Sequence, residues 1–234
     1  GYTRHNYTNS FGGTFFFKLD AKSGEKILSS FSEFDLDFLS VATGWSKKDL
    51  LKDQKKGKLV EMGYHTYSLR SVVKKVDGGV FQIYESHSNS SSPNGGTTFW
   101  LSGDIMILNI GSEGKLIWGK FINKNQRMPK GMEIFNSHIM IVQGSELFFL
   151  FNDSEKNTSL KNIQYPETFK NPKKSRLVLV RIDAEGTFEK QLLNKFESSE
   201  VAIMPAPLIQ NQEGEVLFLG QFAKKRRLGR LMLN

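Results

Sequence analysis

The most constraining feature of this sequence is the stretch Asp104–Ile122, in which two apolar runs flank the polar segment Gly111–Gly114. The first run, at 105–110, has apolar residues at adjacent positions, so both faces of a strand there would be apolar. Such a strand is typically buried on both faces, as in a sheet that packs between two other sheets. The glycines and polar residues between the runs are typical of a tight turn. The stretch therefore predicts a hairpin within a stack of sheets.

The same order of features recurs along the chain. An apolar run, an Asp and a glycine-containing turn follow one another at Phe15–Gly24 and again at Leu177–Gly186. A hairpin that repeats on short strands is the sequence signature of a β-propeller. We therefore expect an all-β chain made of four-stranded antiparallel propeller blades.

Strand and turn patterns predict blade-like units at about 1–35, 64–122, 137–193 and 206–234. The units at 64–122 and 137–193 each have four strands, whereas the first has two clear strands and the last has three. A closed propeller typically needs about four or more complete blades. We therefore expect the chain to be the C-terminal part of a larger propeller, with residues 1–13 as an edge strand.

Residues 32–58 interrupt the strand pattern. Ser46 can cap a helix there, and Asp49 would occupy its third position. We therefore predict a short basic helix in an insertion at about 45–57.

Two further expectations follow from the strand pattern. The apolar strands at 105–110, 146–151, 177–182 and 216–220 should be buried on both faces. The irregular segments 86–103, 123–136 and 152–175 should gather on one side, because loops on a rigid scaffold are where binding usually occurs. The residues to which we assign a partner-binding role are Glu85, His87, Phe99, Trp100, Asn152, Asp153 and Tyr165.

Several of these stretches resemble known propeller families. Asp104–Lys120 resembles the repeat of bacterial secreted propellers, and Leu19–Leu28 resembles the repeat of quinoprotein-type propellers. A longer region, about 64–233, resembles a group of uncharacterised exported bacterial propeller proteins. The residues that carry this wider resemblance are Asp77-Gly78-Gly79, Glu85, Lys124, Gln126, Asn152-Asp153 and Arg227–Leu231. It implies an exported protein, in the periplasm or at the outer membrane or cell surface. The chain departs from the group at Ser86-His87-Ser88, where the group tends to have aromatic residues.

Composition excludes several classes of site. The chain has no Cys, so disulfides, zinc–thiolate sites and thiol catalysis are excluded. Its net charge is +8, but the Lys and Arg residues are spread along the whole chain without a nucleic-acid-binding motif, so we expect no nucleic-acid partner. No apolar run approaches the ~18 residues of a transmembrane segment. The four His residues lack metal-ligand spacing, so we predict no metal site, no cofactor and no catalytic residue.

Together these features predict a non-enzymatic binding or scaffold module of a bacterial envelope or exported assembly. The expected partner is another protein, the remainder of the propeller, or a glycan. The alternative is a glycoside hydrolase or lyase, because carboxylates distant in sequence can meet in a propeller channel. A third, weaker alternative is a polyanion-binding protein that uses the basic surface.

Overall fold

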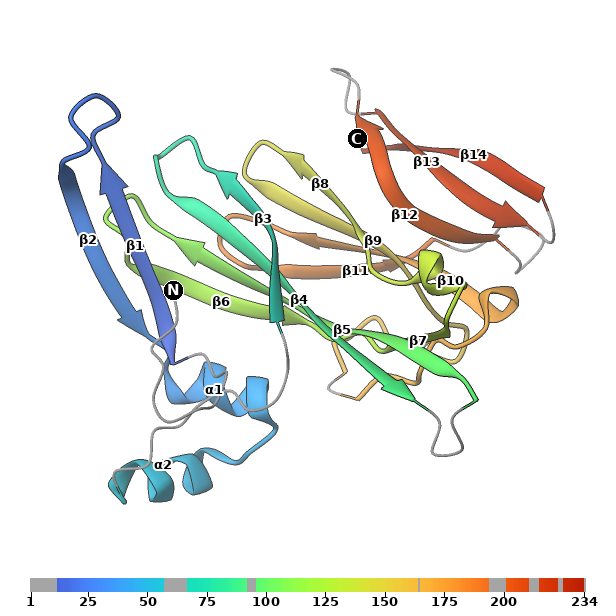
Figure 1. Cartoon of the computed structure of the whole chain (residues 1–234), viewed down its shortest axis with the longest axis horizontal. Coiled ribbons are helices and arrows are strands. Elements are labelled where there is room, and N and C mark those ends of the chain that lie inside the picture. Colours follow the sequence, from blue (N-terminus) through green and yellow to red (C-terminus); the bar gives the residue numbers. More distant parts are fainter. Residues whose placement is uncertain are drawn as a thin grey trace. The chain divides into compact units, whose positions relative to one another are not determined.

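The computed structural model describes residues 12–56, 67–91, 96–163, 165–193, 201–210, 215–222 and 225–233. These residues form a mostly β structure of antiparallel sheets, so the all-β prediction is confirmed (Figure 1). The predicted edge strand at 1–13 lies almost wholly outside the described residues. Contacts divide the chain into a first unit, Gly1–Tyr84 with Ile105–Phe121, and a second unit, Glu85–Asp104 with Ile122–Asn234.

The first unit contains a two-stranded sheet, two helices and parts of a larger sheet. The small sheet pairs β1 (Gly13–Leu19) with β2 (Lys26–Glu33). The larger sheet has the order β3-β4-β5-β6, with β7 also paired to β5. Its strands are β3 (Tyr67–Lys74), β4 (Val80–Ser91), β5 (Thr98–Ile110) and β6 (Leu116–Ile122). β4 and β5 contribute residues to both units.

Two helices follow β2, and the sequence predicts only the second. In α2 (Lys47–Lys55), the backbone N–H of Asp49 donates to Ser46 Oγ at 3.2 Å, as the predicted cap requires. The unpredicted helix α1 (Leu36–Thr43) has an equivalent cap, because Phe38 N–H donates to Asp35 Oδ1 at 2.7 Å. Both helices contribute to one apolar core, which also contains β5 and β6 residues: Phe34, Phe38, Leu39, Leu50, Tyr67, Met106, Leu108 and Phe121.

The second unit contains two further antiparallel sheets. The four-stranded sheet has the order β11-β10-β9-β8, and the three-stranded sheet has the order β12-β13-β14. The elements of this unit are β7 (Gln126–Pro129), η1 (Glu133–Phe135), β8 (Ile139–Gln143), β9 (Glu146–Ser154), η2 (Pro172–Lys174), β10 (Ser175–Ile182), β11 (Phe188–Leu192), β12 (Val201–Gln210), β13 (Glu215–Phe222) and β14 (Lys225–Met232). The predicted units at 137–193 and 206–234 have the same numbers of strands, but β12 begins before residue 206, and the division into propeller blades stays a prediction.

Burial on both faces is confirmed for three of the four strands in question. In β5, β9 and β10 the predicted segments are buried almost throughout. The prediction is wrong for 216–220 in β13, where Leu219 is 41% exposed. Leu219 pairs with Leu228 of β14, which is 68% exposed, so this face of the sheet is in part open to solvent.

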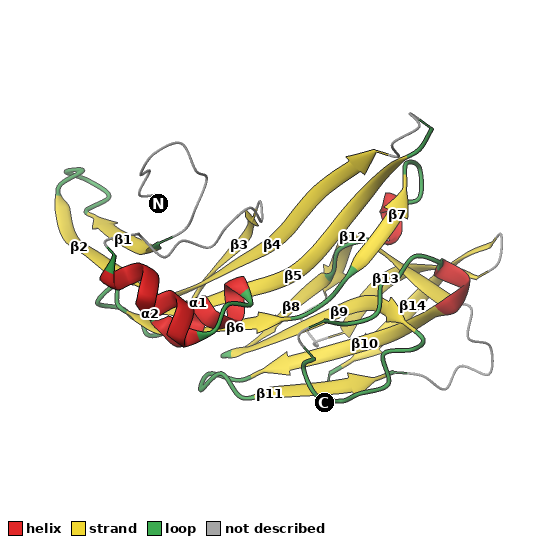
Figure 2. Cartoon of the chain, turned by 90° about the horizontal axis from the view of Figure 1, so that it is seen from below, coloured by secondary structure: helices red, strands yellow, loops and turns green. Residues whose placement is uncertain are grey.

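The segment expected to be a loop after Glu85 is mostly strand. β4 continues to Ser91 and β5 begins at Thr98, so a long β4–β5 ribbon replaces most of the predicted irregular segment (Figure 2). The β4 part of this ribbon, 86–91, is polar, so it lacks the apolar pattern that predicts strands. In the other part of the ribbon, β7 provides β5 with a further hydrogen-bonded neighbour. The ribbon positions the polar cluster described next.

Candidate functional site

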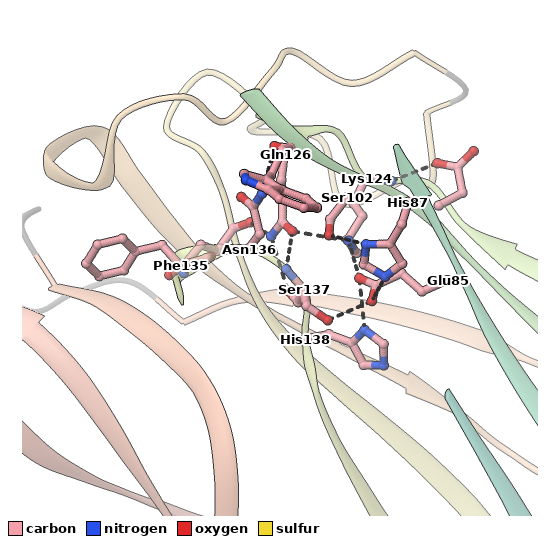
Figure 3. A network of polar contacts seen from close by, with 12 residues as sticks. Glu85, His87, Ser102, Lys124, Gln126, Phe135, Asn136, Ser137 and His138 are labelled. Carbon is pink, nitrogen blue, oxygen red and sulfur yellow. Dashed lines mark hydrogen bonds and ion pairs between the residues drawn. The ribbon is translucent and has the colours of Figure 1, made fainter. Parts of the chain in front are cut away.

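A completely buried carboxylate lies at the centre of a polar network in the second unit (Figure 3). Glu85 Oε1 lies 2.6 Å from Lys124 Nζ and 3.3 Å from His138 Nδ1. Glu85 Oε2 lies 2.8 Å from His87 Nε2 and accepts a hydrogen bond from Ser137 Oγ at 2.6 Å. We call this network the Glu85 cluster: Glu85, His87, Ser102, Lys124, Gln126, Ser137 and His138.

Strand periodicity brings the first members of the cluster together. Glu85 and His87 are two positions apart on β4, so their side chains lie on the same face of the sheet. Ser102 on β5 meets them there, with its Oγ 3.1 Å from His87 Nδ1. Lys124 follows β6, and its backbone N–H donates to Asp104 Oδ1 at 3.0 Å. The Lys124 side chain has no solvent exposure, so its ammonium and the Glu85 carboxylate form a buried ion pair.

Gln126 connects the cluster to the segment that precedes β8. Its Oε1 accepts hydrogen bonds from Lys124 Nζ at 3.1 Å and from the backbone N–H of Ser137 at 2.6 Å. Its Nε2 donates to the carbonyl of Asn152 at 2.8 Å. Ser137 has a φ of 77°, a left-handed conformation that is uncommon for a residue other than glycine. Hydrogen bonds at its N–H, its carbonyl and its hydroxyl hold this conformation.

The electrostatics of the cluster keep Glu85 ionised. Burial by itself would raise the pKa of Glu85, but the positive charge of Lys124 and hydrogen bonds from His138 and His87 hold it far below the usual carboxyl range. The general acid of a glycosidase requires a carboxyl group whose pKa is raised. Glu85 therefore suits the role of counter-ion to Lys124 better than that of a proton donor.

Ser102, His87 and Glu85 are also the residue types of a hydrolase relay. His87 lies between the other two, with Nδ1 3.1 Å from Ser102 Oγ and Nε2 2.8 Å from Glu85 Oε2. However, Ser102 is only 2% exposed, and the Glu85 carboxylate is shared with Lys124 and Ser137. A nucleophile has to reach its substrate, so this arrangement fits a structural chain of hydrogen bonds.

Two candidate residues on β9, Asn152 and Asp153, lie inside the unit. Asn152 Nδ2 donates to the carbonyls of Phe135 and Ile203, and its Oδ1 accepts from Ile203 N–H, so it joins β9 to η1 and β12. Asp153 Oδ1 accepts from Asn157 Nδ2 at 2.6 Å, and its Oδ2 lies 3.7 Å from Lys190 Nζ. Burial raises the pKa of Asp153 and outweighs these contacts.

The aromatic candidates lie nearer the solvent. Trp100 is 42% exposed and Tyr165 is 79% exposed. The carbonyl of Trp100 accepts a hydrogen bond from Asn136 Nδ2 at 3.0 Å, next to Ser137 in the cluster. Phe99 lies beneath the guanidinium of Arg127, at 4.1 Å from ring centroid to Arg Cζ. Partner binding by these residues stays a prediction.

Hydrogen bonds join the three segments that were expected to gather. Residues 99–102 of β5 pair with β7, so 86–103 and 123–136 lie side by side. Along the other edge of β7, Phe169 N–H donates to the Asn125 carbonyl and Arg127 N–H donates to the Phe169 carbonyl, each at 2.8 Å. Asn125 Nδ2 also donates to Thr168 Oγ1 at 2.9 Å. The third segment, 152–175, therefore extends the same surface, and we call 98–102, 125–129 and 165–170 together the β5–β7 surface.

The sequence identified part of the cluster and missed the rest. Glu85 and His87 were predicted as partner-binding residues, and Lys124 and Gln126 were among the residues that carry the family resemblance. Ser102, Ser137 and His138 were missed. A polar pair two positions apart at the end of an apolar strand, as in Glu85 and His87, is the local signal that could have indicated a polar cluster.

Two kinds of site are not found among the described residues. No group of three or more His, Asp or Glu side chains is arranged to hold a metal ion. Within the same part of the chain, neither helix is long and apolar enough to cross a membrane.

Comparison with known proteins assigns no family. No family model matches the chain, and no curated protein matches it significantly. One solved structure is similar in part, a protein of unknown function from Bacteroides caccae. It is 12% identical, the alignment covers 68% of this chain and 73% of that chain, and the TM-score is 0.19. A similarity at this level carries no argument about fold or function.

Proposed function

We propose that this chain is a non-enzymatic binding module of an exported bacterial assembly, working in the periplasm or at the cell surface. Its ligand is another protein or a glycan. The observation that carries this proposal is the placement of exposed aromatic side chains next to a fixed polar core. Trp100 is two residues from Ser102 of the Glu85 cluster, and Tyr165 belongs to the segment that bonds to Asn123 and Asn125, on either side of Lys124.

The state of the buried carboxylates supports binding over hydrolysis. Glycoside hydrolases place two carboxylates, separated by roughly 5–10 Å, on either side of the scissile bond. Glu85 and Asp153 are both enclosed by protein, and Glu85 is neutralised by Lys124. Neither carboxylate is therefore available to a sugar in this structure.

The sheets of the second unit support the blade interpretation that belongs to this proposal. β8–β11 form a four-stranded antiparallel sheet whose two central strands, β9 and β10, are buried on both faces. Central strands of this kind are what stacked propeller blades require. Rigid sheets would then hold the β5–β7 surface in one conformation and lower the entropic cost of binding.

The test removes the exposed aromatic side chains and leaves the cluster intact. Trp100→Ala and Tyr165→Ala should each weaken binding to purified envelope proteins or to an arrayed glycan by about tenfold or more, as for aromatic residues at the centre of an interface. The matched control is Trp45→Ala, because Trp45 is 54% exposed but belongs to the first unit. Equal binding by all three variants and the wild-type protein would refute the proposal, provided that their thermal unfolding is unchanged.

A further inference from the structure

The residues of the β5–β7 surface alternate between an inner side, which is buried except at Trp100, and an outer side. Residues that pair directly across antiparallel strands share a side, so Trp100 and Ser102 lie with Met128 and Gln126, both of which are buried. The alternate residues face outward. The outer side therefore consists of Phe99, Leu101, Arg127 and Pro129, extended beyond β7 by the bonded pair Asn125 and Thr168.

Arg127 is held in a fixed orientation on this outer side. Its guanidinium stacks on Phe99 and its side chain is exposed, while its backbone N–H is bonded to Phe169. Stacking fixes the plane of an Arg side chain and leaves its N–H edge free to bind a carboxylate with two hydrogen bonds. Among the described residues, no carboxylate pairs with Arg127.

A second cation lies next to Arg127. Phe169 forms a parallel bridge to Gln126, so the following residue, Lys170, lies beside Arg127 on the neighbouring segment. Lys170 is exposed, and none of the described residues forms an ion pair with it. None of the residues that make up the outer side carries a carboxylate, and the exposed carboxylate of Glu167 precedes Thr168 in the chain. This side is therefore positively charged, with the half-buried side chains of Leu101 and Pro129 on either side of the Arg127–Phe99 pair.

We propose that the outer side binds an acidic segment of a partner protein, with one carboxylate held by Arg127 and another near Lys170. This inference rests on the proposed binding function and names the partner's chemistry. On the outer side, Phe99 has Arg127 over one face of its ring, so this ring is less available to stack on a sugar. The amide of Asn125 and the hydroxyl of Thr168 bond to each other. Two cations beside apolar side chains therefore fit a peptide that carries both carboxylates and apolar residues.

The test measures binding of a fluorescein-labelled peptide of alternating Glu and Leu to the full chain by fluorescence anisotropy. Arg127→Ala should weaken binding by about tenfold or more, since it removes a bidentate charged contact. Arg127→Lys should restore only part of the affinity, because an ammonium cannot form the paired hydrogen bonds. Lys170→Ala should weaken binding less than Arg127→Ala does. Lys161→Ala, a change at another exposed lysine of the same unit, should leave the affinity unchanged.

Salt and a competing ligand complete the test. Raising the salt concentration should weaken binding of the wild-type protein more than that of Arg127→Ala, because surface charge pairs are screened. No peptide binding, or equal binding by wild type and Arg127→Ala, would overturn the proposal. Tighter binding of polygalacturonate than of the peptide, lost in Arg127→Ala, would assign the site to an acidic glycan and overturn the protein partner. Trp100→Ala changes the opposite side, so its result tests the binding function separately.

Discussion

At the scale of single residues, two buried carboxylates of the second unit respond to burial in opposite ways. Glu85 contacts an ammonium, two imidazoles and a hydroxyl, and its pKa is lowered. Asp153 accepts hydrogen bonds from Asn157 and Ser154, but the ammonium paired with it, Lys190 Nζ, lies 3.7 Å away, and burial raises the pKa of Asp153. The Glu85 charge therefore stabilises the folded state, whereas the Asp153 charge is costly there.

We predict that Glu85→Gln lowers the free energy of unfolding at pH 7 by about 3–5 kcal/mol, because it leaves the buried Lys124 ammonium without its counter-ion. Asp153→Asn should cost about 1 kcal/mol or less, since the new amide oxygen can still accept from Asn157 and Ser154. Urea unfolding followed by tryptophan fluorescence measures both values. Equal losses for the two variants would contradict this account of the cluster.

The same two variants should differ in their pH dependence. The lowered pKa of Glu85 gives a stabilising contribution that is complete above the unfolded carboxyl pKa of about 4.3 and is lost as the pH falls. The advantage of the wild-type protein over Glu85→Gln should therefore shrink by about 1.4 kcal/mol per pH unit below pH 4. The raised pKa of Asp153 has the opposite sign, so its contribution is present below the unfolded pKa and is lost as the pH rises. The free energy of unfolding of the wild-type protein relative to that of Asp153→Asn should therefore fall between pH 3.5 and pH 7. Parallel curves of unfolding free energy against pH for the wild-type protein, Glu85→Gln and Asp153→Asn would refute both assignments.

Many of the buried polar residues could be singled out from the sequence, but their burial could not be predicted from it. The residues that carry the family resemblance include five buried polar side chains: Glu85, Lys124, Gln126, Asn152 and Asp153. Their residue types suggested a binding surface, because polar residues are mostly exposed. Their burial depends on contacts between strands far apart in the chain, which no local pattern contains. Ser137 could not be found because its role depends on a left-handed backbone conformation after η1.

At the scale of elements, sequence patterns agreed with the structure where a turn or a cap is held by hydrogen bonds between residues close in the chain. Asp77-Gly78-Gly79 has the residue types of a hairpin turn, and in the structure Gly79 N–H donates to Asp77 Oδ1 at 2.9 Å while Gly78 has a φ of 86°. α1 was missed although Asp35 caps it and Gly44 ends it with a φ of 72°. Apolar and acidic residues alternate over 34–38 as in a strand, so the helix depends on tertiary packing against β5 and β6.

That packing leads to a prediction for Gly119 in β6. A Cβ atom at this position would lie 2.6 Å from Phe38 Cδ2, inside normal contact distance. Phe38 in turn packs on Phe121, with 4.8 Å between ring centroids. Gly119→Ala should therefore displace α1 from the sheet and cost about 1–3 kcal/mol, as overpacking of a core does.

Thermal unfolding monitored by circular dichroism measures this loss. The matched control is Gly96→Ala, because a Cβ atom there would meet nothing within 4 Å. We expect the control to be as stable as wild type. Similar melting temperatures for the two glycine variants would show that Phe38 can move without loss of stability.

At the scale of the whole molecule, the sequence predicted the sheets better than their assembly. The repeated hairpins predicted antiparallel sheets, and the strand counts of β8–β11 and β12–β14 agree. How sheets associate depends on side chains that face other sheets, and exposed apolar side chains mark where such an association is incomplete.

In the first unit, Phe15 and Phe31 pair across β1 and β2, and Phe17 and Leu19 continue the same face. All four side chains are exposed.

This exposed face predicts self-association of the purified chain. Single exposed apolar residues are ordinary, but a contiguous apolar surface favours contact with another surface. The double change Phe17→Gln with Phe31→Gln, at residues that are 57% and 50% exposed, should therefore shift the protein toward monomer in sedimentation velocity. Its free energy of unfolding should stay within about 0.5 kcal/mol of wild type, because neither ring is in the core. Val76→Gln is the control, since Val76 is fully exposed in a turn outside this face. If the double variant and the control sediment like the wild-type protein at every concentration, this face does not drive association, and the apolar side chains of β1 and β2 tolerate water.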